Sequence, residues 1–439
     1  MTTLPPTAGY KPGDMLVLIG ELFGRGYANG LVEEAKRLGM SVTGTTVGRR
    51  DSDGTLRQLT AEELAEAENT LGGKIINIPL EAGFDMETPE GLPSVSEQLK
   101  KVKPDEWEST LFDSGFIEKA RASGTARFRS NLALVMEQLE KLVPAGANII
   151  FAHTMAGGIP RARVFMPLLN RLFKGTGDKH LPSEPFWQSG LGHLCDASFN
   201  EVTADTFSHL VDVSAKLYER NSSAGAKVAY TAYGYHGTAI LLDGEYRWQS
   251  YTPYLQGVAK MRLEDHAEAA RKRGINATVF NCPEIQTNSS ALFLGVELSL
   301  FPLITSLAKD AAVNSAPLLD RCASLLKEGV TINHVATEAE NILKSPEISS
   351  ALDFQSWPQH STSRQMDAML AASALLMDMH SDQKQLVCAE LSRLVFLATG
   401  HLMVQSSWSA QESAVWLNHD IITRLAATDM GRELIRKRG

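Results

Sequence analysis

The chain has 439 residues, of which 44% are hydrophobic and 21% charged; this composition is typical of a globular protein with a large core and excludes general disorder. The formal net charge of −9 gives no electrostatic reason to expect nucleic acid or an anionic membrane surface as a partner. The four cysteines are far apart and form no Cys-x-x-Cys pair, so neither a zinc site nor a disulfide framework is indicated. Because the sequence shows no signal-peptide pattern and no run of about 18 apolar residues, we expect a cytoplasmic protein without an integral membrane segment.

The chain begins with a predicted strand, helix and second strand. Residues 15–19 form an apolar run, Leu31, Ala35 and Leu38 recur at helical spacing, and residues 41–46 form the second strand. The same alternation continues, with strands predicted at 74–79, 147–153, 226–232 and 277–281 and helices at 60–70, 129–142, 202–220 and 253–273. Strands that alternate with helices in this way predict a parallel sheet with helices on both faces.

We expect a Rossmann-type doubly wound α/β core over residues 1–310 and a mainly helical C-terminal region, residues 311–439, packed on it. Two segments of the core have little periodicity and resemble insertions or loops near a site. Residues 82–115 are rich in Pro, Gly and acidic side chains, and residues 155–200 are rich in Gly, Pro and aromatic side chains.

Three glycines, Gly20, Gly24 and Gly26, follow the first predicted strand directly. Glycine permits backbone angles closed to other residues and lets the backbone approach a pyrophosphate, while the N-terminus of the next helix offers unpaired N–H groups. The spacing G-x-x-x-G-x-G resembles that of the short-chain dehydrogenase/reductases. The alternative is that the glycines only permit a tight strand-to-helix turn.

The ends of the second and fourth strands carry further candidate cofactor contacts. Thr46 is followed by Arg49 and Arg50, and basic side chains at this place favour NADPH over NADH, unless the two arginines are simply solvated at the surface. His153 ends the fourth strand, where it could contact the cofactor, although a buried histidine without a functional role explains it equally well.

A tyrosine and a lysine at unusual spacing are the candidate catalytic pair. The Tyr-x-x-x-Lys of ordinary short-chain reductases is absent, and so is a Tyr-x6-Lys, but Tyr251 and Lys260 form a Tyr-x8-Lys. Nine residues of continuous helix would turn the two side chains to opposite faces, so the tyrosine must precede the helix. Thr252 as N-cap and Pro253 as the first helical residue would supply that break.

The surrounding residues extend the pattern. Tyr235 follows the fifth strand, and Thr287 and Ser289 follow the sixth. With the Tyr-x8-Lys, this arrangement resembles the FabV-type enoyl-acyl carrier protein reductases and the trans-2-enoyl-CoA reductases over residues 15–310, and it also resembles a small group of enoyl reductases known as FabMG. The glycine turn departs from the FabV type, and an insertion, residues 241–248, lies between the two tyrosines and leaves the role of Tyr235 open.

The resemblance implies NADH- or NADPH-dependent reduction of the 2,3 double bond of a trans-2-enoyl thioester, carried by acyl carrier protein or CoA, in fatty acid biosynthesis. It implies that Tyr251 stabilises the enolate, that Lys260 holds the ribose hydroxyls, and that Tyr235 makes a supporting contact to the thioester oxygen. Thr287 and Ser289 would contact the cofactor.

Two other functions remain open from the sequence: a short-chain carbonyl or alcohol oxidoreductase with a divergent Tyr/Lys pair, and a non-catalytic regulator that senses a dinucleotide. A tyrosine packed at a helix start is the corresponding structural explanation of Tyr251. His193, Cys195 and Asp196 have the side-chain types of metal ligands but lack a fourth ligand at suitable spacing, so no metal is expected. A homo-oligomer is compatible with the sequence.

Overall fold

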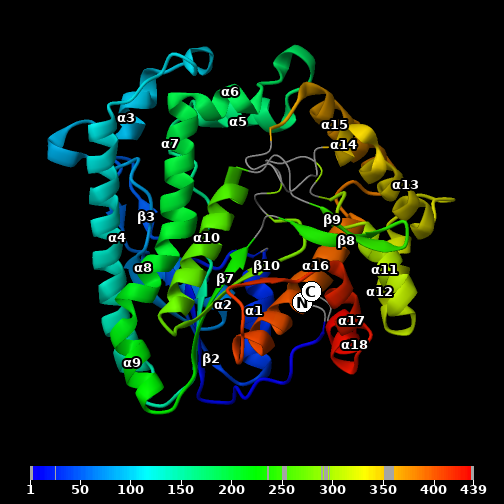
Figure 1. Ribbon diagram of the computed structural model, residues 1–439, viewed down its shortest axis with the longest axis horizontal. Helices are drawn as coiled ribbons and strands as arrows, with labels where there is room; N and C mark the ends of the chain where they lie inside the picture. Colours follow the sequence, from blue (N-terminus) through cyan, green and yellow to red (C-terminus); the bar gives the residue numbers. More distant parts are fainter. Residues whose placement is uncertain are drawn as a thin grey trace.

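The computed structural model describes residues 3–24, 26–234, 237–249, 255–287, 290, 295, 297–350 and 360–436, with the side chains of 255 and 256 excepted. Its centre is a parallel sheet in which the described strands have the order β11-β10-β7-β6-β1-β2-β5 (Figure 1). The strands are β1 (Met15–Ile19), β2 (Ser41–Thr46), β5 (Lys74–Pro79), β6 (Ile149–His153), β7 (Val228–Gly234), β10 (Asn276–Asn281) and β11 (Ala414–Trp416). The order reverses between β1 and β6, which is where doubly wound sheets bind their ligands.

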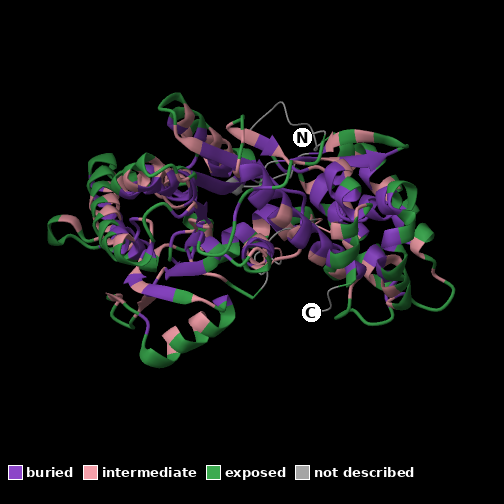
Figure 2. Ribbon diagram, turned by 90° about the horizontal axis from the view of Figure 1, so that it is seen from below, coloured by how far each residue is buried: buried purple, intermediate pink, exposed green. Residues whose placement is uncertain are grey.

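Helices cover both faces of the sheet, and the strand side chains on each face belong to separate hydrophobic clusters. One face packs against α4 (Ser114–Leu142), α8 (Thr206–Val213), α9 (Ala215–Ser223) and α10 (Leu255–Lys272). The other packs against α1 (Tyr27–Arg37), α2 (Ala61–Leu71) and α16 (Val387–Ser407). Figure 2 shows the buried residues concentrated along the strands and on the inward sides of the helices, as expected for parallel strands buried on both faces.

Two further groups of helices complete the chain. The segments that resembled insertions contain η1 (Pro89–Gly91), α3 (Val95–Gln98), η2 (Leu99–Lys101), η3 (Pro104–Glu106), α5 (Phe165–Lys174), η4 (Gly177–Lys179), α6 (Ser183–Gln188) and α7 (Gly190–Phe199), and they share their own hydrophobic cluster. The end of the predicted core contains α11 (Pro302–Asp310), and the C-terminal region contains α12 (Ala312–Ser324), α13 (Ile332–Lys344), α14 (Pro346–Ser349), α15 (Ser363–Asp378), α17 (His419–Ala426) and α18 (Asp429–Arg436). This second group packs in one cluster with α1 and α16.

The structure confirms the six predicted sheet strands and adds elements that the sequence pattern did not show. Strand β11 extends the sheet beside β10, and two hairpins are present, β3 (Arg49–Arg50) with β4 (Leu56–Arg57) and β8 (Thr238–Leu242) with β9 (Glu245–Gln249).

The single helix predicted for residues 202–220 is wrong. The chain forms a π-helical turn, η5 (Asn200–Asp205), and then α8 and α9, which separate at Ser214. The Ser214 hydroxyl contacts the carbonyl of Leu210 at 2.7 Å and the hydroxyl of Tyr230 at 2.7 Å, and side-chain contacts of this kind disturb regular helix.

Helix α16 crosses α1 at very close range. A Cβ added to Gly400 would lie 2.1 Å from the carbonyl carbon of Gly30, so glycine at both positions allows backbone to meet backbone. Helix α16 is also long and apolar enough to cross a membrane, but 72% of its apolar window is buried inside the fold, as in the core helix of a globular domain.

Candidate active site

The glycine turn joins β1 to α1 at the carboxyl edge of the sheet. Gly20 has a φ of +126°, its N–H donates to Thr45 Oγ1 at 2.9 Å, and a Cβ at this position would lie 2.4 Å from Thr154 Oγ1. Gly26 precedes α1 with a φ of +148°, and no side chain caps this helix. The N-terminus of α1 therefore presents the positive end of its dipole at the turn.

A cleft of about 210 Å³ opens above this turn. Its lining comes from the carboxyl ends of four neighbouring strands and includes Gly20 and Glu21 after β1, Val47 after β2, Glu81 after β5 and Thr154 after β6. Ser198 and Val202 close the cleft from α7 and η5. This is the position at which a doubly wound sheet holds the adenosine and pyrophosphate of a dinucleotide.

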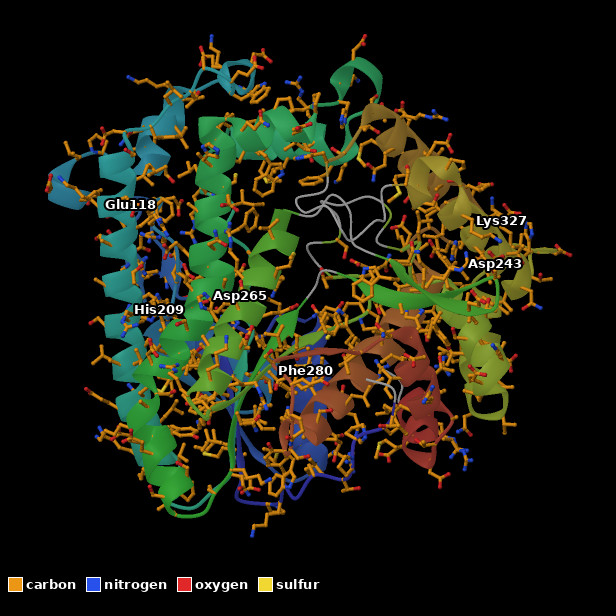
Figure 3. All side chains as sticks on the ribbon, viewed as in Figure 1. Glu118, His209, Asp243, Asp265, Phe280 and Lys327 are labelled. Carbon is orange, nitrogen blue, oxygen red and sulfur yellow. The ribbon has the colours of Figure 1, made fainter. Side chains whose placement is uncertain are left out.

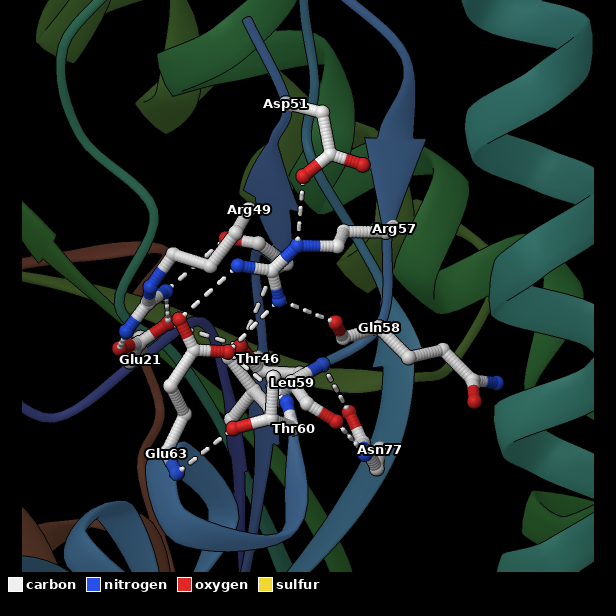
Figure 4. Close-up of polar contacts among 11 residues, drawn as sticks. Glu21, Thr46, Arg49, Asp51, Arg57, Gln58, Leu59, Thr60, Glu63 and Asn77 are labelled. Carbon is white, nitrogen blue, oxygen red and sulfur yellow. Dashed lines mark hydrogen bonds and ion pairs between the residues drawn. The ribbon is translucent and has the colours of Figure 1, made fainter.

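The two arginines that favoured NADPH are each bound to a carboxylate that lines the cleft. Arg49 makes two hydrogen bonds to Glu21, at 2.8 and 2.9 Å, and Thr46 Oγ1 donates to the same carboxylate at 2.8 Å (Figure 4). Burial alone would raise the pKa of Glu21, but these hydrogen bonds and the positive charge of Arg49 lower it.

Arg50 binds Glu81 in the same manner, with its Nε 2.8 Å from Oε2, and Arg161 contacts Glu81 Oε1 at 3.0 Å. Both arginines of β3 therefore have carboxylate partners, and neither is a freely solvated surface charge.

His153 lies at the end of β6 but is not among the residues that line the cleft. Its ring is 1% exposed, its Nε2 lies 2.8 Å from Thr206 Oγ1, and Phe207 packs edge-on against it. Burial, together with the nearby positive charge of Lys260, lowers the pKa of His153 to about 3, so the ring is neutral at physiological pH. This environment agrees with the alternative of a buried histidine.

Of the three predicted catalytic residues, Lys260 is the one that lies among the described residues. It lies on α10, its side chain is buried, and its Nζ donates to the carbonyl oxygen of Tyr233 near the end of β7 at 2.6 Å. Burial lowers the pKa of Lys260 to about 8. An ammonium in this position keeps its charge at neutral pH in a setting of low dielectric constant, where it acts strongly on nearby groups.

A carboxyl group one helical turn beyond Lys260 was not foreseen. Glu264 Oε1 accepts a hydrogen bond from Asn281 Nδ2 at 2.8 Å, at the end of β10. Burial raises the pKa of Glu264 to about 7, and the hydrogen bond from Asn281 lowers this pKa by a smaller amount. The two side chains of α10 thus reach the carboxyl ends of adjacent strands, since Asn281 pairs with Gly234 in the sheet register.

Three predicted site residues, Tyr235, Tyr251 and Ser289, lie outside the described residues, and so does the expected helix start at Thr252 and Pro253. Among their described neighbours, Gly234 ends β7, the strand whose Tyr233 carbonyl accepts from Lys260, and Leu255 begins α10, the helix that carries Lys260. Thr287, whose backbone N–H donates to Ser290 Oγ at 2.7 Å, follows β10 at the same edge of the sheet. The described ends of β7 and β10 and the helix that carries Lys260 therefore meet at this edge.

A dinucleotide fits the residues that are present. The turn at Gly20 has no room for a side chain, a Cβ at Gly24 would meet no atom within 4 Å, and the N-terminus of α1 is uncapped. These features provide a close backbone approach and N–H donors for a pyrophosphate. Within the described residues no group of three or more His, Cys, Asp or Glu side chains could hold a metal ion, and Cys195 is a buried free thiol.

Comparison with known proteins assigns the family. Residues 1–426 match the family model described as enoyl-acyl carrier protein reductase FabMG. A solved apo structure of FabMG is 46% identical, with 97% of this chain and 96% of that chain covered and a TM-score of 0.92. An NADH-bound structure of FabMG is 38% identical, with 97% of both chains covered and a TM-score of 0.78.

A search of curated proteins gave no match. The family model and the two structures decide between the functions left open by the sequence, because they favour conjugate reduction over a carbonyl reductase or a non-catalytic regulator. The chain belongs to the FabMG family and is an enoyl-acyl carrier protein reductase, an oxidoreductase that uses a nicotinamide dinucleotide to reduce the CH–CH bond of an enoyl thioester in fatty acid synthesis.

Proposed function

We propose that Tyr251 and Lys260 carry the reduction of the enoyl thioester and that Tyr235 makes a supporting contact to the thioester oxygen. The observation that supports this most is the position of Lys260, buried with its Nζ on the Tyr233 carbonyl. That carbonyl lies two residues before Tyr235, and the helix that carries Lys260 begins four residues after Tyr251.

A nicotinamide bound in this position supplies the hydride for the β-carbon of the substrate. Negative charge then develops on the thioester oxygen, and the Tyr251 hydroxyl donates a hydrogen bond to it. The ammonium of Lys260 binds the ribose hydroxyls and, through its positive charge, makes a neighbouring phenol a stronger hydrogen-bond donor. A proton from solvent water then adds to the α-carbon of the enolate, which releases hydroxide to the medium and completes the saturated acyl thioester. Thr287 and Ser289 contact the cofactor after β10.

We propose NADH as the physiological cofactor, in place of the NADPH that Arg49 and Arg50 favoured in the sequence. Both guanidinium groups are bound by Glu21 and Glu81, so a 2′-phosphate would have to approach two carboxylates instead of two open cations. A ribose with free hydroxyls can donate hydrogen bonds to such carboxylates. The 38% identical FabMG structure is an NADH-bound one, which supports the same choice.

The remaining elements of the proposal follow from the substrate class. The acyl chain is presented on acyl carrier protein, with the CoA thioester as the small-molecule counterpart, and the reaction takes place in the cytoplasm. Glu81, Arg161 and the end of β5 then lie beside the adenosine half of the cofactor.

The test is a steady-state assay of nicotinamide oxidation with crotonyl-acyl carrier protein, run with NADH and NADPH for the wild type and for Tyr251→Phe. Loss of one hydrogen bond to the developing oxyanion lowers kcat by about 10²–10³-fold. Tyr218→Phe, on α9 and remote from the cleft, is the matched control and keeps the wild-type rate. Full activity of Tyr251→Phe would refute the assignment of this residue, and a higher kcat/KM with NADPH would refute the cofactor proposal.

A further inference from the structure

Asn418 occupies a helix N-cap without capping the helix. It precedes α17, and its backbone has the extended conformation of an N-cap residue, but its side chain makes no capping hydrogen bond. Asparagine at an N-cap ordinarily stabilises the helix through such a bond. Here the Asn418 Oδ1 accepts instead from the backbone N–H of Ala239 at 2.9 Å and from Thr238 Oγ1 at 3.2 Å. The side chain is therefore directed to the first two residues of β8.

The β8–β9 hairpin that receives these bonds is fixed at both ends to the C-terminal region. At its tip, Asp243 Oδ1 lies 2.7 Å from Lys344 Nζ, and the Asp243 N–H donates to Glu340 Oε1 at 2.6 Å. Figure 3 shows Asp243 beside the C-terminal helices, away from Asp265 on α10. At its base, Trp248 packs against Trp416 of β11, with ring centroids 6.1 Å apart.

The base of the hairpin lies between the two candidate tyrosines in the chain. Thr238 pairs with Gln249 in the hairpin register, so the base begins three residues after Tyr235 and ends two residues before Tyr251. Gly237 leaves no room for a side chain, because a Cβ there would lie 2.3 Å from Trp248 Cζ2. The hairpin pairing thus brings the two ends of the insertion together at Thr238 and Gln249. Asn418 binds the hairpin at this base.

The position of Asn418 connects this hairpin to the sheet. Leu417, the residue before it, donates its N–H to the carbonyl of Asn281 at 2.8 Å, and Trp416 pairs with Asn281 in the register of β10 and β11. The same Asn281 contacts Glu264 on α10, the helix that carries Lys260. One set of contacts at the edge of the sheet therefore fixes both the lysine helix and the hairpin base.

We propose that Asn418 is a positioning residue for enoyl reduction, which sets the place of Tyr251 relative to Lys260 by holding the base of the β8–β9 hairpin. The proposal rests on the proposed function of Tyr251. It also gives a role to β11 and α17, which supply this anchor although none of their residues is among those that line the cleft.

The experiment is a double-mutant cycle that combines Asn418→Ala with Tyr251→Phe, with kcat and the KM for NADH and crotonyl-acyl carrier protein as readouts. Displacement of a catalytic group by about 1 Å costs roughly 10²-fold, so Asn418→Ala alone is expected to lower kcat by 10- to 100-fold, with the KM for NADH within about twofold of the wild type. In the Tyr251→Phe background the same substitution is expected to have almost no further effect on kcat.

Two further variants keep the result interpretable if Asn418→Ala folds poorly. Asn418→Asp retains an oxygen for both donors and is expected to restore kcat to within about threefold, while Thr238→Val removes only the hydroxyl contact and gives a smaller loss. Lys344→Ala, at the exposed tip, is the matched control and leaves kcat unchanged. Additive effects of Asn418→Ala and Tyr251→Phe would overturn the positioning role, whereas an unaffected Tyr251→Phe would overturn the proposed function itself.

Discussion

Replacement of Lys260 by methionine is expected to abolish the activity. It is also expected to remove the free-energy cost of burying a charged ammonium group in the folded protein. Burial lowers the pKa of this lysine from 10.5 to about 8, a difference of about 2.5 pH units. At about 1.36 kcal/mol per unit, this corresponds to a cost of ~3 kcal/mol to the folded apo protein wherever both states are protonated. The lost hydrogen bond to the Tyr233 carbonyl offsets this gain by a constant amount at every pH.

The sign of the pH dependence follows from the direction of the shift. Below about pH 8 the lysine is charged in both states, and the full cost is present. Between about pH 8 and pH 10.5 the folded state binds fewer protons than the unfolded state, so the wild type gains stability relative to Lys260→Met as the pH rises. By pH 10 about 2.5 kcal/mol of the cost has disappeared.

The assay is calorimetric unfolding of the apo wild type and Lys260→Met at pH 7 and pH 10. For a chain of this length 1 kcal/mol corresponds to about 1 °C in Tm, so the Tm of the variant relative to the wild type is expected to fall by roughly 3 °C between the two pH values. Lys272→Met, which replaces an exposed lysine on the same helix, is the matched control for the loss of an ammonium group. An equal difference at both pH values would refute the buried ammonium of Lys260.

Two other predictions concern the crossing of α1 and α16 and the carboxyl group of Glu264. Gly400→Ala places a Cβ within 2.1 Å of the carbonyl carbon of Gly30. This clash with the backbone is expected to lower the free energy of unfolding by about 3 kcal/mol, which is measured as a lower Tm. Gly24→Ala is the control, because a Cβ at Gly24 meets no atom within 4 Å and causes no clash. Glu264→Gln keeps an oxygen for Asn281 but cannot ionise. Because burial raises the pKa of Glu264 to about 7, the Tm of the wild type is expected to lie below that of this variant at pH 8 and close to it at pH 5. A Tm difference that does not depend on pH would contradict the prediction.

The parallel core was predictable because its strands are short runs rich in apolar and β-branched residues and its helices have regular apolar spacing. Strand β11 was not, because it is three residues long and exists through its pairing with β10. The β8–β9 hairpin could have been predicted from the sequence, because Asp243-Gly244 is a typical hairpin turn. In the structure both residues have positive φ, 51° and 77°.

The site was predictable where it is local in sequence and not where it depends on tertiary contacts. The glycine turn and the position of Lys260 follow from motifs within a few residues. The partners of Arg49 and Arg50 are 28 and 31 residues away, so their neutralisation could not be read from the second strand alone. Glu264, four residues after Lys260, was accessible from helical spacing, whereas Asn418 depends on how the C-terminal region folds back.

The late position of β11 in the chain has a consequence for synthesis on the ribosome. Its first residue, Ala414, follows the last residue of β10 by 133 positions, and α16, which packs on α1, is made in the same interval. A nascent chain that has reached β10 therefore presents an unpaired strand edge and an apolar sheet face that α16 does not yet cover, both of which favour aggregation. Residues 1–281, which contain six of the seven described sheet strands, are synthesised long before β11 and α16 are available to complete the sheet and its cover. Slow elongation over residues 282–413 would therefore prolong the need of this part of the chain for a chaperone.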